Sequence, residues 1–108
     1  MLKTLTIANA ATTSDEAALE NGASPLGLVF PATFTGATVT LKSRWGAAGS
    51  EVVVQQIGGG GDYTVTVAVG KYVPLDPRVV KGIRNLTIVS SAPEGGARSV
   101  GVVFDPLA

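Results

Sequence analysis

The stretch GDYTVTVAVGKYVPLDPRVVKGIRNLTIVS, residues 61–90, decides the fold class of this chain. Near its start, Val65, Val67 and Val69 alternate with threonine or alanine. Successive side chains of a strand point to opposite faces of a sheet, so this alternation predicts a half-buried strand. Gly70 then permits a tight turn, because glycine adopts backbone angles that other residues avoid.

The second half of the stretch predicts a break and a further strand. A strand is expected over residues 71–75, and Asp76-Pro77 ends it, because proline lacks the amide hydrogen that a ladder needs. Residues 77–81 should form one helical turn that begins at Pro77 and is capped by Asp76. A strand over residues 85–89 follows, so the expected order is strand, turn, strand, short crossover, strand.

The rest of the chain predicts more short strands separated by turn residues. They are expected over residues 3–9, 26–30, 37–45, 51–57 and 98–104. Short strands at such regular spacing indicate an antiparallel sandwich rather than an α/β fold. The fold class is therefore all-β, an antiparallel β-sandwich of about eight strands with no long helix. The crossover favours Greek-key or jelly-roll wiring over a simple meander, and residues 1–108 are expected to form a single domain.

Four segments carry more particular expectations. Residues 26–30, LGLVF, do not alternate, which indicates either a strand covered on both faces or a buried edge. Residues 15–20 fit a helical turn or a plain surface loop, and both readings stay open. The glycines at 58–61 should form a hairpin tip, because a phosphate loop needs a following Lys-Ser or Lys-Thr and a helix. Phe34 is expected to cover one end of the core.

Composition limits the classes of function. Hydrophobic residues make up 45% of the chain, enough for one core, whereas only 15% of the residues are charged, against about 25% in an average protein. The eight basic and eight acidic residues cancel, which argues against binding to nucleic acid or to a membrane surface. A surface so poor in charge favours burial in an assembly; alternatively, alanine, glycine and threonine simply dominate it.

Residue types also bear on chemistry and location. The chain has no cysteine and no histidine, so it lacks disulfides, thiolate or imidazole metal ligands and the usual nucleophile–base pairs. Its carboxylates fall in loops or at strand ends, where solvation or capping is their ordinary role. The acidic group Asp15, Glu16 and Glu20 lacks the alternating spacing of a calcium loop. We therefore expect no enzymatic activity, no cofactor and no metal. The N-terminus has no apolar run typical of a signal peptide, which predicts synthesis in a cytoplasm.

The first group of candidate partner contacts is basic and surrounds the crossover. It consists of Lys71, Arg78, Lys81 and Arg84. The alternative is a solvated face in which Arg78 or Arg84 pairs with Asp76, since surface pairs are common and weak.

The second group is aromatic. Arg44 and Trp45 stand together beside a predicted flexible loop, with Tyr63 and Tyr72 elsewhere. An exposed tryptophan next to arginine is typical of an interface anchor and also suits stacking on a sugar. The alternative is that Trp45 covers the core at a strand end.

Three segments of the chain resemble proteins encoded among the head genes of tailed bacteriophages. They are TIANAATTSDEAAL, PLGLVFPATFTGATVTLKSR and DYTVTVAVGKYVPLDPRVVKGIRNLTIVS, which together cover most of the chain. The family that this pattern resembles is that of capsid decoration, or cement, proteins. The resemblance implies a β-sandwich that forms homotrimers, and it carries no site residue with it. The last strand departs from the family pattern, because only Arg98 remains of its arginines.

The first hypothesis is therefore a virion structural protein. It would bind the major capsid protein on the outer capsid surface, as a trimer, and stabilise the contacts between shell subunits. The second is a carbohydrate-binding module or fibre head that uses Trp45 and a tyrosine as stacking surfaces. The third is a component of the tail or of the head–tail connector.

Overall fold

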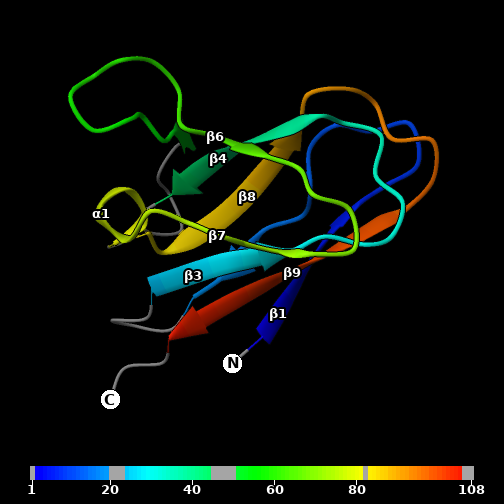
Figure 1. Ribbon diagram of the computed structural model, residues 1–108, viewed down its shortest axis with the longest axis horizontal. Helices are drawn as coiled ribbons and strands as arrows, with labels where there is room; N and C mark the ends of the chain where they lie inside the picture. The colour runs from blue at the N-terminus through cyan, green and yellow to red at the C-terminus, as the bar shows by residue number, and fades with distance from the viewer. Residues whose placement is uncertain (1, 20–23, 45–50, 82, 106–108) are drawn as a thin grey trace.

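The structure is a computed structural model that describes residues 2–19, 24–44, 51–81 and 83–105. These residues form two antiparallel sheets that pack against each other as a sandwich (Figure 1). The described residues contain nine strands and one short helix, so the predicted all-β sandwich is confirmed.

The strands divide into two sheets. The first sheet contains, in spatial order, β1 (Leu2–Ile7), β9 (Arg98–Asp105), β3 (Ser24–Val29) and β7 (Tyr72–Pro74). The second sheet contains β2 (Ala17–Ala18), β8 (Asn85–Ser90), β4 (Thr38–Arg44) and β5 (Val52–Val53), and β6 (Thr64–Thr66) also pairs with β4. The chain passes from the first sheet to the second between β3 and β4 and returns at β7. Helix α1 (Pro77–Val80) then leads back to β8.

The stretch that predicted the fold contains its elements in the expected order. Strands β6 and β7, helix α1 and strand β8 follow one another, and the Asp76 carboxylate caps α1 by accepting the backbone N–H of Arg78 at 3.0 Å. The two predicted strands before α1 are shorter than expected. Val67 donates its backbone N–H to Ala37, and Val69 is 48% exposed, because the chain leaves the second sheet there to reach the first.

The core lies between the two sheets and is built from their alternating inward positions. Leu5, Leu41, Ile88 and Val100 are fully buried on four different strands. Phe34 follows β3 and packs edge to face against Phe30, with ring centroids 5.4 Å apart. Phe34 is 9% exposed, so its predicted place at one end of the core is confirmed.

The segment after the first strand differs from both open expectations. Residues 15–19 form neither a helical turn nor a plain loop, because Ala17 and Ala18 pair with Leu86 and Asn85 as strand β2. Leu19 continues the contact by donating its backbone N–H to Arg84 at 2.7 Å. The edge of β8 offers backbone groups that would otherwise lack partners, and satisfying them outweighs the local preference for a turn.

The glycine tract forms the predicted hairpin tip, but the strand before it is shorter than expected. Only Val52–Val53 pairs as β5, and a single bridge joins Gln55 to Asp62 below the tip. Gly58, Gly59 and Gly61 adopt positive φ angles of 88°, 75° and 122°. These angles suit glycine alone and turn the chain out of the sheet, which ends the pairing. We call residues 55–62 the glycine hairpin.

Ser43 supports a prediction about stability. It lies on the buried face of β4 with 0% exposure, and its Oγ has no hydrogen-bond partner among the described residues. A buried polar group without a partner is destabilising, so Ser43→Ala should raise the free energy of unfolding by about 1 kcal/mol. Urea unfolding measures this as a higher midpoint at unchanged slope.

Ser90→Ala is the matched control for Ser43→Ala, because Ser90 is also buried but its hydroxyl has acceptors within hydrogen-bond distance, the Ala92 carbonyl and the Glu94 carboxylate. This control should lower the free energy of unfolding. A loss of stability in Ser43→Ala would show that its hydroxyl has a partner in solution.

Candidate functional site

The outer face of the first sheet exposes large apolar side chains. Leu2 is 62% exposed, Leu26 42%, Val29 39% and Tyr72 48%. We call these four residues the outer apolar face. An antiparallel sheet with one free face normally presents polar side chains to water, so this face is unusual for a surface left in solvent.

The strand register places Leu2, Val29 and Tyr72 on the same face, and Leu26 lies in the irregular step of β3 between Pro25 and Gly27. Val29 on β3 lies opposite Gly101 on β9 and opposite Tyr72 on β7. Leu2 on β1 lies opposite the half-buried Val103. The apolar side chains therefore extend across all four strands of the first sheet.

Two glycines flatten this surface. A Cβ atom built on Gly101 would lie 2.9 Å from Leu2 and 3.4 Å from Val29. One on Gly27 would lie 2.4 Å from the Tyr72 ring. The neighbouring side chains lean over the two glycines and occupy the space that a larger residue would need. No side chain therefore projects from the outer apolar face at these two positions.

This geometry corrects the prediction for LGLVF. Neither expected arrangement is found, because Leu28 and Phe30 face the core while Leu26 and Val29 stay exposed on a strand inside the sheet. The segment has the apolar pattern of a strand covered on both faces, but the described residues of this chain cover only one.

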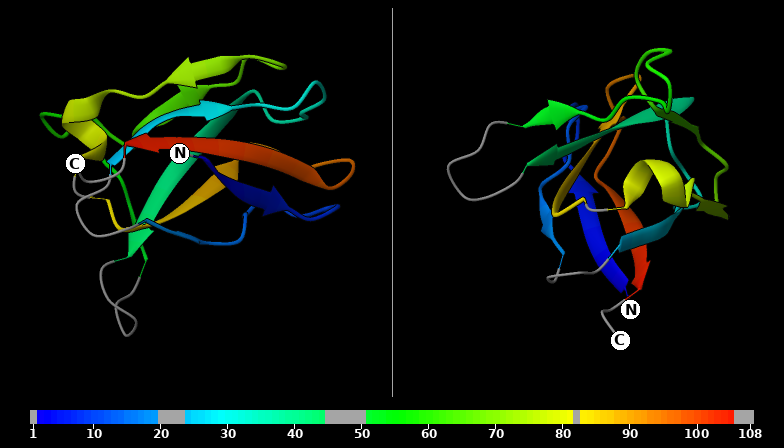
Figure 2. Two further views of the ribbon diagram at one scale, coloured as in Figure 1. Left: turned by 90° about the horizontal axis from the view of Figure 1, so that it is seen from below. Right: turned by 90° about the vertical axis from the view of Figure 1, so that its left-hand side faces the viewer.

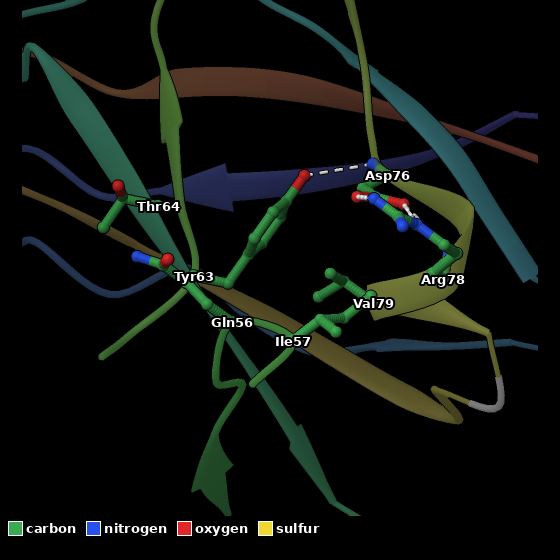
Figure 3. Close-up of a pocket in the computed structure, with 7 residues that line it drawn as sticks. All are labelled: Gln56, Ile57, Tyr63, Thr64, Asp76, Arg78 and Val79. Carbon is green, nitrogen blue, oxygen red and sulfur yellow. Dashed lines mark hydrogen bonds and ion pairs between the residues drawn. The ribbon is translucent and has the colours of Figure 1, made fainter. Parts of the chain in front are cut away.

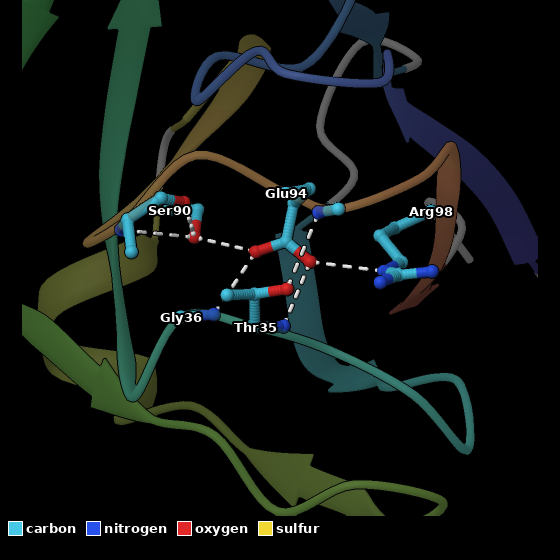
Figure 4. Close-up of polar contacts among 7 residues, drawn as sticks. Thr35, Gly36, Ser90, Glu94 and Arg98 are labelled. Carbon is cyan, nitrogen blue, oxygen red and sulfur yellow. Dashed lines mark hydrogen bonds and ion pairs between the residues drawn. The ribbon is translucent and has the colours of Figure 1, made fainter.

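At one end of the sandwich, three loops are held together by Glu94 (Figure 4). These loops, residues 8–13, 31–37 and 91–97, form what we call the loop end, at the right of Figure 1. One oxygen of the Glu94 carboxylate accepts from the Thr35 backbone N–H at 2.8 Å and from Arg98 Nε at 3.0 Å.

The other carboxylate oxygen of Glu94 is also bonded. It accepts from the Gly36 backbone N–H at 3.0 Å and from the Ser90 hydroxyl at 2.9 Å. The backbone of Glu94 adds a third link, since its N–H donates to Ala11 and its carbonyl accepts from Ala10. One residue thus ties all three loops together.

Glu94 also corrects the expectation that the loop carboxylates are solvated or act as caps. It is 1% exposed. Burial alone would raise the pKa of its carboxyl, but the hydrogen bonds from Thr35, Gly36, Ser90 and Arg98 outweigh burial and hold the pKa below its ordinary value. The signal in the sequence was faint: a lone acid among small residues, four positions before an arginine.

The side chains on the surface of the loop end cost little free energy to bury against another protein. Glu94 is the only charged residue in its three loops. Its exposed residues are small or short, among them Ala8, Ala10, Ala32 and Pro93. Alanine and proline lose almost no side-chain freedom on burial, and no exposed charge in these loops would have to leave water. Binding of another protein at the loop end therefore loses little side-chain entropy and removes no charged group of these loops from water.

The predicted aromatic group is only partly within the described residues. Arg44 binds Glu16 with two nitrogens, including Nε to Oε2 at 2.9 Å, and this hydrogen bond lowers the pKa of the Glu16 carboxyl. Trp45 lies outside the described residues. Tyr72 lies on the outer apolar face, away from the chain segment that carries Arg44.

The structure separates one member of the predicted basic group from the other three. Arg78 pairs with Asp76, as the alternative reading expected, and the Arg78 side-chain hydrogen bonds lower the pKa of that carboxyl. Lys81 is exposed just after α1, and Arg84 is half-buried. Lys71 follows the Gly70 turn near the loop end, where its carbonyl accepts from the backbone of Phe30. Lys71 therefore lies apart from Arg78, Lys81 and Arg84, which remain in α1 or next to it.

A small pocket lies between the glycine hairpin and α1 (Figure 3). It is at the end of the sandwich that is turned toward the viewer in the right panel of Figure 2. It has a volume of about 290 Å³ and is lined by Gln56, Ile57, Tyr63, Thr64, Asp76, Arg78 and Val79. The Tyr63 hydroxyl accepts the backbone N–H of Asp76 at 3.0 Å, which joins the hairpin to the start of α1. Sequence reasoning singled out Tyr63 and Arg78 but gave no sign that they share a pocket.

Within the described ranges, no group of three or more acidic, histidine or cysteine residues is placed to hold a metal ion. None of the helices in those ranges has the length and apolar character needed to cross a membrane. Comparison of the chain with protein-family models, with curated proteins and with solved structures finds no match in any of the three.

Proposed function

We propose that this chain is a non-enzymatic structural protein of a virus particle, a decoration protein that binds the outer capsid surface as a homo-oligomer. The observation that carries the proposal is the outer apolar face, an exposed apolar surface on a sheet that has no covering layer among the described residues. The resemblance of the sequence to decoration proteins supports the same function. The major capsid protein is the proposed partner.

The proposed mechanism is burial of surface across subunit boundaries. Each buried Å² of apolar surface contributes about 25 cal/mol, and a closed ring of copies repeats each contact. We assign the outer apolar face to contacts between copies, with a trimer as the expected closed form. The loop end then remains for the shell, because its loops are joined by the hydrogen bonds of Glu94 and expose only small, uncharged side chains.

A single substitution tests the contact between copies. Val29→Glu places an unpaired carboxylate in the middle of the outer apolar face and should weaken self-association at least about tenfold, because burying that charge is strongly unfavourable. Sedimentation velocity over a concentration series measures the loss. Thr66→Glu is the matched control, since Thr66 is an exposed strand threonine of the second sheet and should leave self-association unchanged.

Binding to the shell is tested separately. The wild-type protein should bind purified capsids that lack it and raise their melting temperature. A wild-type protein that stays monomeric and leaves capsids unchanged would contradict the proposal. The number of copies per particle distinguishes a capsid protein from a tail or connector component. A capsid component is present in many copies, and a tail or connector component in few.

A further inference from the structure

The pocket between the glycine hairpin and α1 plays no part in the proposed function. Its polar groups keep hydrogen-bonding capacity that the fold does not use. The Tyr63 hydroxyl accepts from the Asp76 backbone, and a phenol can still donate its own hydrogen. The Gln56 side-chain nitrogen donates to the Asp62 carbonyl at 3.3 Å, and this bond does not engage its amide oxygen.

The ion pair in the pocket supplies both donors and acceptors. Asp76 accepts from the backbone N–H, Nε and Nη2 of Arg78, which uses three of about four lone-pair positions on the carboxylate. A guanidinium has five N–H donors, and this pair engages two of them. Two adjacent hydroxyl groups of one ligand could therefore donate to the Asp76 carboxylate and accept from the Arg78 guanidinium, which lie side by side.

The charge of the pocket selects against anions. Among the described residues that line it, Asp76 and Arg78 alone are charged, and they neutralise each other. A phosphate or sulfate needs a cation that is not already paired, and it would face the Asp76 carboxylate directly. A neutral ligand meets no such repulsion.

The remaining walls are apolar. Ile57 is 56% exposed at the edge of the glycine hairpin, Val79 faces it from α1, and the Tyr63 ring forms the third side (Figure 3). The C–H face of a sugar ring packs well on such groups while its hydroxyls reach the polar ones. Gly58 and Gly59 have no atom within 4 Å of a built Cβ, so the tip of the hairpin has open space in which to adjust.

We propose that this pocket binds one ring of a neutral saccharide, with adjacent hydroxyls on Asp76 and Arg78 and the ring face on Ile57 and Val79. The volume of about 290 Å³ accommodates one sugar ring rather than a chain. This site uses Tyr63 and does not need Trp45, so it differs from the stacking surface that the sequence suggested. It is also independent of self-association through the outer apolar face.

The test is a titration of the full chain with single neutral sugars, glucose, galactose, mannose and N-acetylglucosamine, followed by amide chemical shifts in NMR spectra. At least one should shift the amides of residues 56–57, 63–64, 76 and 78–79 at millimolar concentration. Ile57→Ala should weaken that binding about 3- to 10-fold, because it removes part of the apolar surface on which the sugar ring packs. Val52→Ala is the matched control, because Val52 is 50% exposed against 56% for Ile57 but is not among the residues that line the pocket.

Several outcomes overturn the proposal. The absence of shifts with all four sugars excludes a neutral monosaccharide. Stronger binding of inorganic phosphate than of any sugar shows that the class of ligand is wrong. Equal binding by Ile57→Ala and Val52→Ala shows that the sugar binds elsewhere. Ile57 lies in the exposed glycine hairpin, so its variant is expected to fold. Sedimentation of the same samples measures self-association, so the proposed function is tested separately from sugar binding.

Discussion

Replacing Glu94 with glutamine should lower the free energy of unfolding by about 3 kcal/mol. The carboxylate has donors on both oxygens, with Thr35 and Arg98 on one and Gly36 and Ser90 on the other. Glutamine keeps the shape but turns one oxygen into an NH₂ group. Whichever way the amide is oriented, its hydrogens then face donors, and a buried backbone N–H loses its acceptor.

Urea unfolding of the wild type and of Glu94→Gln measures this loss. Glu16→Gln is the control, because Glu16 also pairs with an arginine but lies at the surface, where such pairs contribute little. Its effect should be much smaller. If the two variants lose equal stability, the hydrogen bonds of Glu94 do not hold the loop end together.

The same carboxylate should make the wild type sensitive to acid. Because the folded state lowers the pKa of Glu94, the ionised form stabilises the fold. This contribution is fully present above the ordinary glutamate pKa of about 4.3 and is lost as the pH falls through the lower folded value. The stability difference between wild type and Glu94→Gln should therefore narrow below about pH 4. A difference that stays constant into the acid range would contradict the assignment.

Replacing Phe30 with alanine is the second large effect, an expected loss of about 3–5 kcal/mol. Phe30 directly follows β3 and is 2% exposed, and its ring packs edge to face on Phe34. The substitution removes the ring, leaves a cavity and takes away the surface on which Phe34 packs. Thermal and urea unfolding, followed by circular dichroism, measure the loss.

Phe30→Leu is the matched variant, because leucine refills most of the volume and should lose less than about 1.5 kcal/mol. Near-equal losses for leucine and alanine would show that the aromatic contact with Phe34, rather than filled volume, stabilises this end of the core. A loss below about 1 kcal/mol for alanine would contradict the packing described here.

Local patterns in the sequence were enough to predict several elements. The alternation around Val65 predicted a strand with that residue buried, and Asp76-Pro77 predicted a capped helical turn. The glycine run predicted a hairpin tip. Each of these signals acts between residues only a few positions apart, so it is present in the sequence before any folding.

The two-residue strand β2 and the role of Glu94 were not predictable in this way. Ala17 pairs only because the edge of β8 comes to lie beside it. Glu94 meets Thr35 and Gly36 across 59 and 58 positions of the chain. Contacts of this kind exist only after the sheets have packed, and no local pattern records them.

The sequence by itself determined that this chain is a sandwich of short antiparallel strands, because a period of two and the turn residues between strands are local properties. Only the tertiary structure decided which surfaces the sandwich presents. The outer apolar face needs Leu2, Val29 and Tyr72 from three separate strands, set in register over Gly101 and Gly27. The pocket needs a hairpin and a helical turn from different parts of the chain. Surfaces of this kind are made by packing, since they join residues that the chain order keeps apart.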